Sequence, residues 1–218
     1  MAALLHIVNP PPELREKYER VNIGGTATVV EAAIKAGVKR VVLFSTIAVY
    51  GPSDGRVLNE MSPTHPDTFY AQTKRAAEQI VLNARGADGQ PLGTVLRLGA
   101  VYGSRIKGNY ERLTRALARN RFIPIGIGLN RRTLVYDKDV GRAAALAVSH
   151  SAAAGRVFNV TDGGFHTLKE IIESICSALG RKPPRLSLPV GPIRTLIGLI
   201  EKGSHVIGIK PQITRDMI

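Results

Sequence analysis

Hydrophobic residues occur along this chain in short apolar runs that are separated by longer amphipathic stretches. Residues 41–45 form a nearly unbroken run of β-branched and aromatic type, and residues 94–98 form a second apolar run. Such runs predict short strands that are buried on both faces of a parallel sheet. The stretches 13–36 and 69–85 predict helices. Strands separated by helices indicate an α/β fold.

Composition narrows the class of protein. The chain has 218 residues, of which 44% are hydrophobic, and its mean hydropathy of +0.02 is that of a soluble globular protein. No apolar run approaches the length of a membrane span. A single Cys excludes an intramolecular disulfide, and residues 1–8 lack the charged leader of a signal peptide. We therefore expect a cytoplasmic protein that does not enter a membrane.

The net charge of +13, from 30 Lys and Arg against 17 Asp and Glu, would permit binding to nucleic acid. The basic residues are scattered, however, and only 5% of residues are aromatic. A solvated surface suited to anionic metabolites explains the charge better than a nucleic-acid site. The five His and one Cys also show no metal-ligand spacing.

Polar side chains follow the first predicted strand. Ser45 and Thr46 stand at its carboxyl end, where open α/β sheets bind ligands. Tyr70 and Lys74 lie four residues apart on the second predicted helix, so their side chains share one face. Taken alone, this spacing also fits an ordinary solvated helix face.

These side chains suit one half of a hydride transfer. A nearby Lys ammonium favours phenolate, and we therefore expect it to lower the pKa of Tyr70 from about 10. The phenol would exchange a proton with a carbinol whose oxygen is held by a Ser or Thr hydroxyl. The hydride itself requires a nicotinamide, because no side chain accepts one.

The ordered set of motifs resembles the extended short-chain dehydrogenase/reductase superfamily, in its NAD-dependent nucleotide-sugar epimerase/dehydratase family. The resemblance covers nearly the whole chain. It rests on RVNIGGTATVVEAAIKAGVKRVVLFSTIAVYG at 20–51, FYAQTK at 69–74, LRLGAVYG at 96–103, NRRTLVYDKDVGRAA at 130–144 and GRVFNVTDGGFHTLKEIIESICSALG at 155–180.

The resemblance implies a role for each matching residue. Two of these residues also have an ordinary structural interpretation. Asn22 could be a polar residue that bonds locally beside Gly24, and Arg132 could be a surface residue paired with Asp137 or Asp139. NAD is the implied cofactor, with NADP as an alternative. The implied catalytic residues are Thr46, Tyr70 and Lys74, the cofactor-binding residues are Tyr70, Lys74, Asn22, Ser45 and Gly99, and the substrate-binding residues are Thr46 and Arg132.

The family's Gly-x-x-Gly-x-x-Gly motif, whose backbone amides meet the cofactor's pyrophosphate, does not occur in this sequence. We therefore expect an α/β fold with an N-terminally truncated Rossmann-type parallel sheet flanked by helices and a small C-terminal substrate lobe. Residues 3–8, with His6, match the family's fourth strand. The expected NAD-binding domain is 1–103, and the expected substrate lobe is 104–218, with about 134–165 returning to the main sheet.

The preferred function is NAD-dependent epimerisation of a nucleotide-linked sugar through a transient ketone. Dehydratase chemistry is disfavoured because Ile47 and Ala48 stand where that branch has an acidic pair. The alternatives are a reductase or hydroxysteroid-type dehydrogenase on a smaller substrate, and a non-catalytic binding protein that lacks the phosphate loop. By the same resemblance, the helices at 13–36 and 69–85 would form a homodimer interface.

Overall fold

The structure is a computed structural model that describes residues 4, 11–104, 106, 108–189 and 191. The chain divides into two compact units. The first unit comprises Met1–Arg105 and Thr133–Gly164, and the second comprises Ile106–Arg132 and Phe165–Ile218. Apart from Leu4, the predicted strand at 3–8 with its His6 lies outside the described residues.

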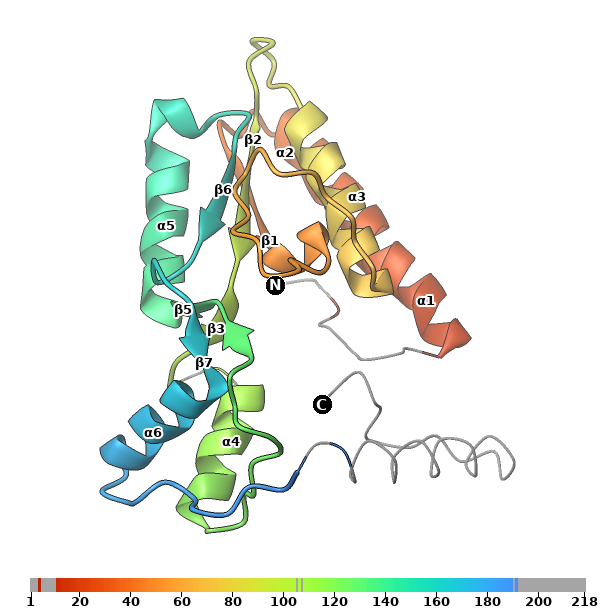
Figure 1. Cartoon of the computed structure of the whole chain (residues 1–218). Coiled ribbons are helices and arrows are strands. Elements are labelled where there is room, and N and C mark those ends of the chain that lie inside the picture. Colours follow the sequence, from red (N-terminus) through yellow and green to blue (C-terminus); the bar gives the residue numbers. More distant parts are fainter. Residues whose placement is uncertain (1–3, 5–10, 105, 107, 190, 192–218) are drawn as a thin grey trace. The chain divides into compact units, whose positions relative to one another are not determined.

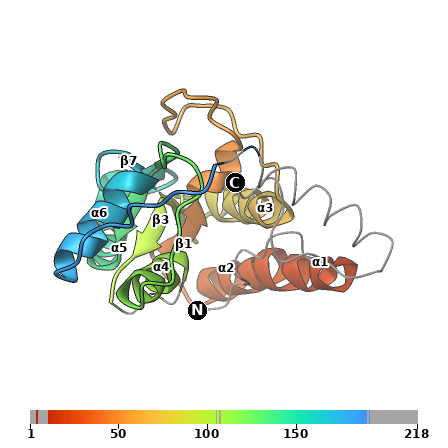
Figure 2. The same cartoon turned by 60° about the horizontal axis from the view of Figure 1, so that its bottom comes forward.

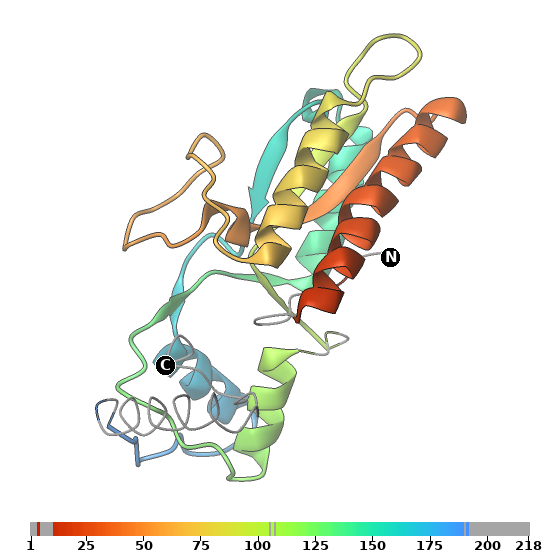
Figure 3. The same ribbon diagram turned by 90° about the vertical axis from the view of Figure 1, so that its right-hand side faces the viewer.

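A parallel sheet forms the centre of the first unit. Its strands are β1 (Val41–Thr46), β2 (Gly93–Leu98) and β6 (Val157–Val160), in the order β1, β2, β6. Helices α2 (Gly25–Lys35) and α3 (Phe69–Asn83) cover one face, and α5 (Asp137–Ser149) covers the other (Figures 1 and 3). A parallel sheet with helices on both faces confirms the predicted fold class.

Local sequence explains why α3 begins where it does and how it packs. Thr68 is its N-cap, and the Thr68 hydroxyl accepts a hydrogen bond from the backbone N–H of Ala71 at 3.2 Å. Further along, Val81 packs into a core with Val30 of α2 and Val95 of β2. Apolar side chains from both helices and the sheet therefore hold α3 on the strands.

The stretch predicted as one helix at 13–36 has an interruption in its middle. It consists of α1 (Pro12–Tyr18), a π-helical turn (Glu19–Gly24) and α2. A π-helical turn is wider than an α-helical one and is common near functional sites. It contains Asn22, whose side chain is buried.

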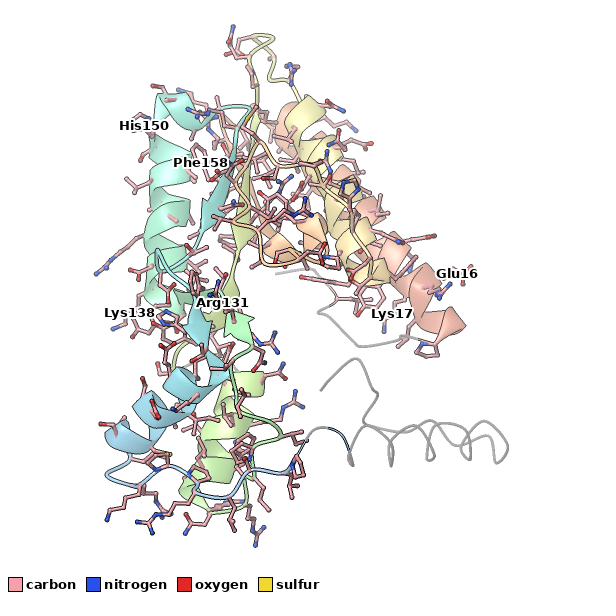
Figure 4. The ribbon with its side chains drawn as sticks, viewed as in Figure 1. Glu16, Lys17, Arg131, Lys138, His150 and Phe158 are labelled. Carbon is pink, nitrogen blue, oxygen red and sulfur yellow. The ribbon has the colours of Figure 1, made fainter. Side chains whose placement is uncertain are left out.

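A second, smaller parallel pair belongs to the same unit. It joins β3 (Ala100–Tyr102) to β5 (Leu134–Tyr136), and α5 follows β5 directly. Lys138 and His150 mark the two ends of α5 (Figure 4). Two 3₁₀ turns complete the unit, at Ile47–Tyr50 and Ser151–Ala153.

The second unit contains α4 (Asn109–Ala118), α6 (Leu168–Ala178) and an antiparallel pair of β4 (Arg131–Arg132) with β7 (His166–Thr167). Helices α4 and α6 pack through Leu117, Ile172 and the free Cys176 (Figure 2). The elements therefore share a small apolar core of their own.

Helix α6 begins with a capping box. Thr167 donates from its backbone N–H to the Glu170 carboxylate at 2.7 Å, and its hydroxyl accepts from the Glu170 backbone N–H at 3.2 Å. In the part of the chain that is described, no helix is long and apolar enough to cross a membrane.

Candidate active site

Thr46 ends β1 and begins the 3₁₀ turn that follows. Its Oγ1 accepts a hydrogen bond from the backbone N–H of Ala48 at 3.2 Å. A hydroxyl that accepts one hydrogen bond can still donate its own proton, which leaves Thr46 able to bind a substrate oxygen. Gly51 closes the turn at φ +73°, where a Cβ would lie only 2.2 Å from the carbonyl oxygen of His65. The turn therefore needs glycine there.

Tyr70 lies in the first turn of α3 and packs against an aromatic neighbour. Its ring meets that of Tyr18 edge to face, with ring centroids 6.4 Å apart, and Tyr18 is completely buried. Burial raises the pKa of Tyr70, and the nearby Tyr18 raises it further. The predicted lowering of this pKa is therefore wrong, because the phenolate would lose hydration beside a second phenol. Tyr70 is a protonated phenol at neutral pH.

Lys74 follows one helical turn later and is only 6% exposed. Burial lowers the pKa of its ammonium, and the carboxylate of Glu78 partly opposes this effect. Tyr70 and Lys74 lie on one face of α3, which packs against both β1 and the 3₁₀ turn after Thr46. The structure thus assembles the three predicted catalytic residues on packed elements of the first unit.

Asn22 connects the π-helical turn to α3. Its amide nitrogen donates to the Thr73 hydroxyl at 3.2 Å, and its amide oxygen accepts from the backbone N–H of Leu4 at 2.9 Å. Thr73 in turn donates to the backbone carbonyl of Tyr70 at 2.9 Å. The Asn22 side chain therefore bonds to other segments, and it supports the helix turn that carries Tyr70.

Ser45 and Gly99 both have internal roles in the structure. Ser45 is 4% exposed and donates from Oγ to the carboxylate of Glu78 at 2.6 Å. At Gly99, a Cβ would lie 3.0 Å from the carbonyl oxygen of Thr133, so the close approach of these backbones leaves little room for a side chain. The cofactor contacts inferred for these two residues stay predictions.

Arg132 belongs to the second unit, in β4, and its side chain is exposed. Its neighbour Arg131 stacks over the ring of Phe165 at 4.2 Å, whereas Asp139 is bonded to Arg142 at 2.9 Å. Among the described residues, no ion pair engages Arg132. The charge of Arg132 favours the phenolate of Tyr110, but burial raises the pKa of that phenol overall. Arg132 therefore remains able to bind an anion.

A buried ionic cluster beside the site was missed by the sequence analysis. Glu78 is completely buried, and its carboxylate accepts from Arg97 Nη2 at 2.7 Å and Nε at 3.0 Å. The Arg97 guanidinium also lies over the ring of Tyr50 at 4.8 Å. One sequence signal was present, because an Arg inside an apolar strand requires a buried partner.

The first unit is therefore a helix-flanked parallel sheet with a Thr hydroxyl at the end of β1 and a Tyr and a Lys on the packed helix α3. Within the described residues, no group of three His, Cys, Asp or Glu is placed to hold a metal ion. The chain belongs to the NAD dependent epimerase/dehydratase family, which matches residues 4–161. NAD is the cofactor of this family.

Two relatives and one solved structure illustrate the membership. The chain is 27% identical over 173 residues to an N-acetyl-α-D-glucosaminyl-diphospho-ditrans,octacis-undecaprenol 4-epimerase of Escherichia coli O157:H7, covering 79% of the chain and 52% of the relative. It is 33% identical over 205 residues to a 3-diazoavenalumate denitrifying reductase of Streptomyces sp, covering 91% and 65%.

Among solved structures, the chain is similar to MoeE5 in complex with UDP-glucose and NAD. The TM-score is 0.74 and the identity 31%, with 87% of this chain and 63% of MoeE5 covered. The chain thus spans between about half and two thirds of the length of these proteins.

Proposed function

We propose that this chain forms the catalytic and substrate-binding part of an NAD-dependent epimerase that acts on a nucleotide-linked sugar through a transient ketone. The observation that carries the proposal is the placement of Tyr70 and the buried Lys74 one turn apart on α3, a helix that packs against β1 and against the 3₁₀ turn that Thr46 begins. Family membership and the similarity to a UDP-glucose complex support it.

Each side chain has a defined task in this proposal. Thr46 donates a hydrogen bond from its hydroxyl to the reacting sugar oxygen and fixes that oxygen beside α3. Tyr70 must first release its phenolic proton; as phenolate it then accepts the proton of the sugar hydroxyl during oxidation, and as phenol it returns that proton to the ketone oxygen during reduction. Burial favours this donor role, because it raises the pKa of Tyr70.

In this proposal, Lys74 and its neighbours bind the ribose of a nicotinamide nucleotide. An ammonium and a phenol one helical turn apart offer donors to two neighbouring hydroxyl groups. Tyr70 and Lys74 would hold the cofactor at its nicotinamide ribose, with Asn22, Ser45 and Gly99 close to it. The bound cofactor supplies the hydride acceptor that no side chain can provide.

The substrate's diphosphate is assigned to Arg132. The planar guanidinium bonds phosphate oxygens in pairs, and this side chain is exposed. In the same proposal, residues 1–103 carry the cofactor site, residues 104–218 mainly form the substrate lobe, and about 134–165 return to the main sheet.

A cytoplasmic homodimer is part of the proposal. The interface would use the helices at 13–36 and 69–85. Apolar side chains are exposed on and just after α2, since Val29 is 57%, Ile34 38% and Val38 41% exposed. Such side chains are available to a partner surface.

A reductase acting on a smaller substrate is the second candidate. The observation that favours it is the 33% identity to the Streptomyces reductase, which exceeds the identity to the epimerase relative. Both candidates use the same Thr, Tyr and Lys chemistry, and they differ in whether a nucleotide diphosphate is recognised.

The test is an assay of the longest in-frame gene product that contains these 218 residues. With NAD and UDP-glucose, we expect NMR to show inversion at one sugar carbon without net consumption of NAD. Net oxidation of NADH by a small ketone, with no inversion of the sugar, would favour the reductase. Binding of neither substrate would contradict the proposal.

A further inference from the structure

A row of polar side chains crosses the sheet one residue before the strand end that carries Thr46. Ser45 of β1, Arg97 of β2 and Asn159 of β6 are register partners on neighbouring strands. Side chains in register on parallel strands point to the same face of the sheet. Thr46 is the next residue of β1, so this row lies one residue before the predicted oxygen-binding position.

Glu78 joins this row to the helix that carries Tyr70 and Lys74. Its Oε1 accepts from Ser45 Oγ at 2.6 Å and from Arg97 Nε at 3.0 Å, and its Oε2 accepts from Arg97 Nη2 at 2.7 Å. Arg75 Nη1, on the same helix, adds a bond to Oε2 at 3.2 Å. We use the name Glu78 network for Ser45, Arg75, Glu78 and Arg97.

Arg97 also contacts the 3₁₀ turn at Ile47–Tyr50. Its guanidinium lies over the Tyr50 ring, and the Tyr50 hydroxyl donates to Asn159 Oδ1 at 2.8 Å. The backbone N–H of Asn159 donates to the carboxylate of Glu60 at 2.7 Å. Arg97 is therefore clamped between α3 and the 3₁₀ turn that Thr46 begins, and neither element can shift without breaking polar contacts.

We propose that Glu78 is a positioning residue of the site, which fixes α3 to the strand end beside Thr46 and holds a buried carboxylate one helical turn from Lys74. The proposal rests on the assignment of Tyr70 and Lys74 to the site under the proposed function. Glu78 acts through these residues and is not itself assigned a contact with substrate or cofactor.

Stability alone does not explain such a cluster. Burying a carboxylate and a guanidinium carries a large desolvation penalty, and well-packed apolar residues often replace a buried ion pair without loss of stability. The cluster also places a carboxylate near Lys74. This lysine precedes Glu78 by four residues, so the two side chains share a helix face, and both are almost fully buried.

Several ionisable groups near Lys74 could affect its pKa. On α3, Arg75 follows Lys74 directly and pairs with Glu78, and Arg97 of β2 pairs with the same carboxylate. Tyr70, one turn before Lys74, packs against Tyr18 of α1. Glu78 is the carboxylate of this group, and its charge favours the ammonium against the effect of burial. Without that carboxylate, Lys74 would lose its proton more readily.

The test is direct titration of Lys74 by NMR in the 218-residue protein labelled with ¹³C-lysine, with Lys74→Met used to assign the signal. In Glu78→Gln we expect the Lys74 midpoint to fall by about one pH unit or more. Glu78→Asp keeps the charge and should restore most of the shift. No cofactor or substrate is present, so the result is independent of whether the proposed activity is found.

The chain offers a matched control in Lys169 and Glu173, which have the same spacing on the exposed surface of α6 with a 4.0 Å contact. Glu173→Gln should hardly move the midpoint of Lys169, because solvent screens exposed pairs. A Lys74 shift in Glu78→Gln that is no larger than this control shift would overturn the proposal.

Glu78→Gln leaves Arg97 buried without its partner and can therefore unfold the protein. The double variant Glu78→Gln with Arg97→Gln leaves neither of these charges unpaired, so we expect it to fold. Because it also removes the positive charge of Arg97, it is compared with Arg97→Gln, from which it differs only by the carboxylate, and its Lys74 midpoint should be the lower of the two. Equal midpoints in these two proteins would likewise refute the role of Glu78.

Discussion

Tyr70 and Tyr18 meet edge to face, with their rings at 70° and their centroids 6.4 Å apart. The contact joins the candidate acid on α3 to a completely buried residue at the end of α1. Because the Tyr18 phenol raises the pKa of Tyr70, the acidity of the site depends on a helix that contributes no predicted catalytic residue.

The first prediction concerns that contact. Tyr18→Phe keeps the ring packing and removes the neighbouring phenol, so we expect the pKa of Tyr70 to fall. It should stay above its ordinary value, since burial, the larger cause, remains. ¹³C-tyrosine NMR titration measures this value, with Tyr136→Phe as a control that changes a ring contact with Tyr102 instead. An unchanged Tyr70 midpoint in Tyr18→Phe would contradict the expectation.

The second prediction concerns NAD. The sequence contains no glycine-rich phosphate motif, so on the proposed assignment Tyr70 and Lys74 would bind only the nicotinamide ribose. Calorimetric titration of the 218-residue protein should show a Kd no tighter than about millimolar, which corresponds to roughly −4 kcal/mol. Lys74→Met should weaken even this binding. A micromolar constant for the wild type would show that another part of the chain binds the pyrophosphate.

The third prediction tests the catalytic assignment in the longest in-frame product. Tyr70→Phe deletes the transferable proton and keeps the ring that packs on Tyr18. We expect turnover to fall by about 10²-fold or more, while circular dichroism and the melting temperature stay close to wild type. Tyr136→Phe should retain activity. Wild-type turnover in Tyr70→Phe would remove this residue from the mechanism and favour a non-catalytic protein.

The fourth prediction separates a nucleotide-sugar enzyme from a reductase of small substrates. If Arg132 binds a diphosphate, Arg132→Ala should raise the KM for UDP-sugar by about ten- to a hundredfold, the equivalent of about 1.5–3 kcal/mol. The kcat should change little, because the diphosphate is remote from the reacting carbon. Arg131→Ala is the matched control, since that side chain is engaged by Phe165. Equal KM values in all three proteins would exclude Arg132 from the site.

The fifth prediction concerns stability. Glu78→Gln breaks a buried ion pair and should lower the free energy of unfolding by about 3–5 kcal/mol. Glu111→Gln breaks an exposed pair with Arg115 on α4 and should cost less than about 1 kcal/mol. Urea denaturation of both variants measures the difference. A Glu78→Gln loss as small as that of Glu111→Gln would mean that solvent reaches the pair.

Much of the first unit could be predicted from local patterns. The apolar runs at 41–45 and 94–98 correspond to β1 and β2, and the stretch at 69–85 corresponds to α3. The π-helical turn at Glu19–Gly24 was not predicted. Its Asn22 bonds to Thr73 and Leu4, and local sequence patterns do not reveal such contacts between distant segments.

The site was harder to predict than the strands. The sequence places Ser45 at a strand end, but only the packing of α3 shows that its hydroxyl bonds to Glu78. The expected effect of Lys74 on Tyr70 was wrong because burial, which periodicity does not measure, dominates the pKa of that phenol. Pairwise spacing identifies candidate groups, whereas their protonation depends on everything that packs around them.

The polar row of Ser45, Arg97 and Asn159 also specifies how the strands align. A slip of β2 by one residue would turn Arg97 toward the face covered by α5, away from Glu78, and would bury an unpaired charge there. Apolar residues such as Val95 and Leu96 would tolerate that slip far better, since both faces of the sheet are covered. The charged residue inside an apolar strand therefore disfavours other registers between β1 and β2. The same register fixes the position of the strand end that carries Thr46.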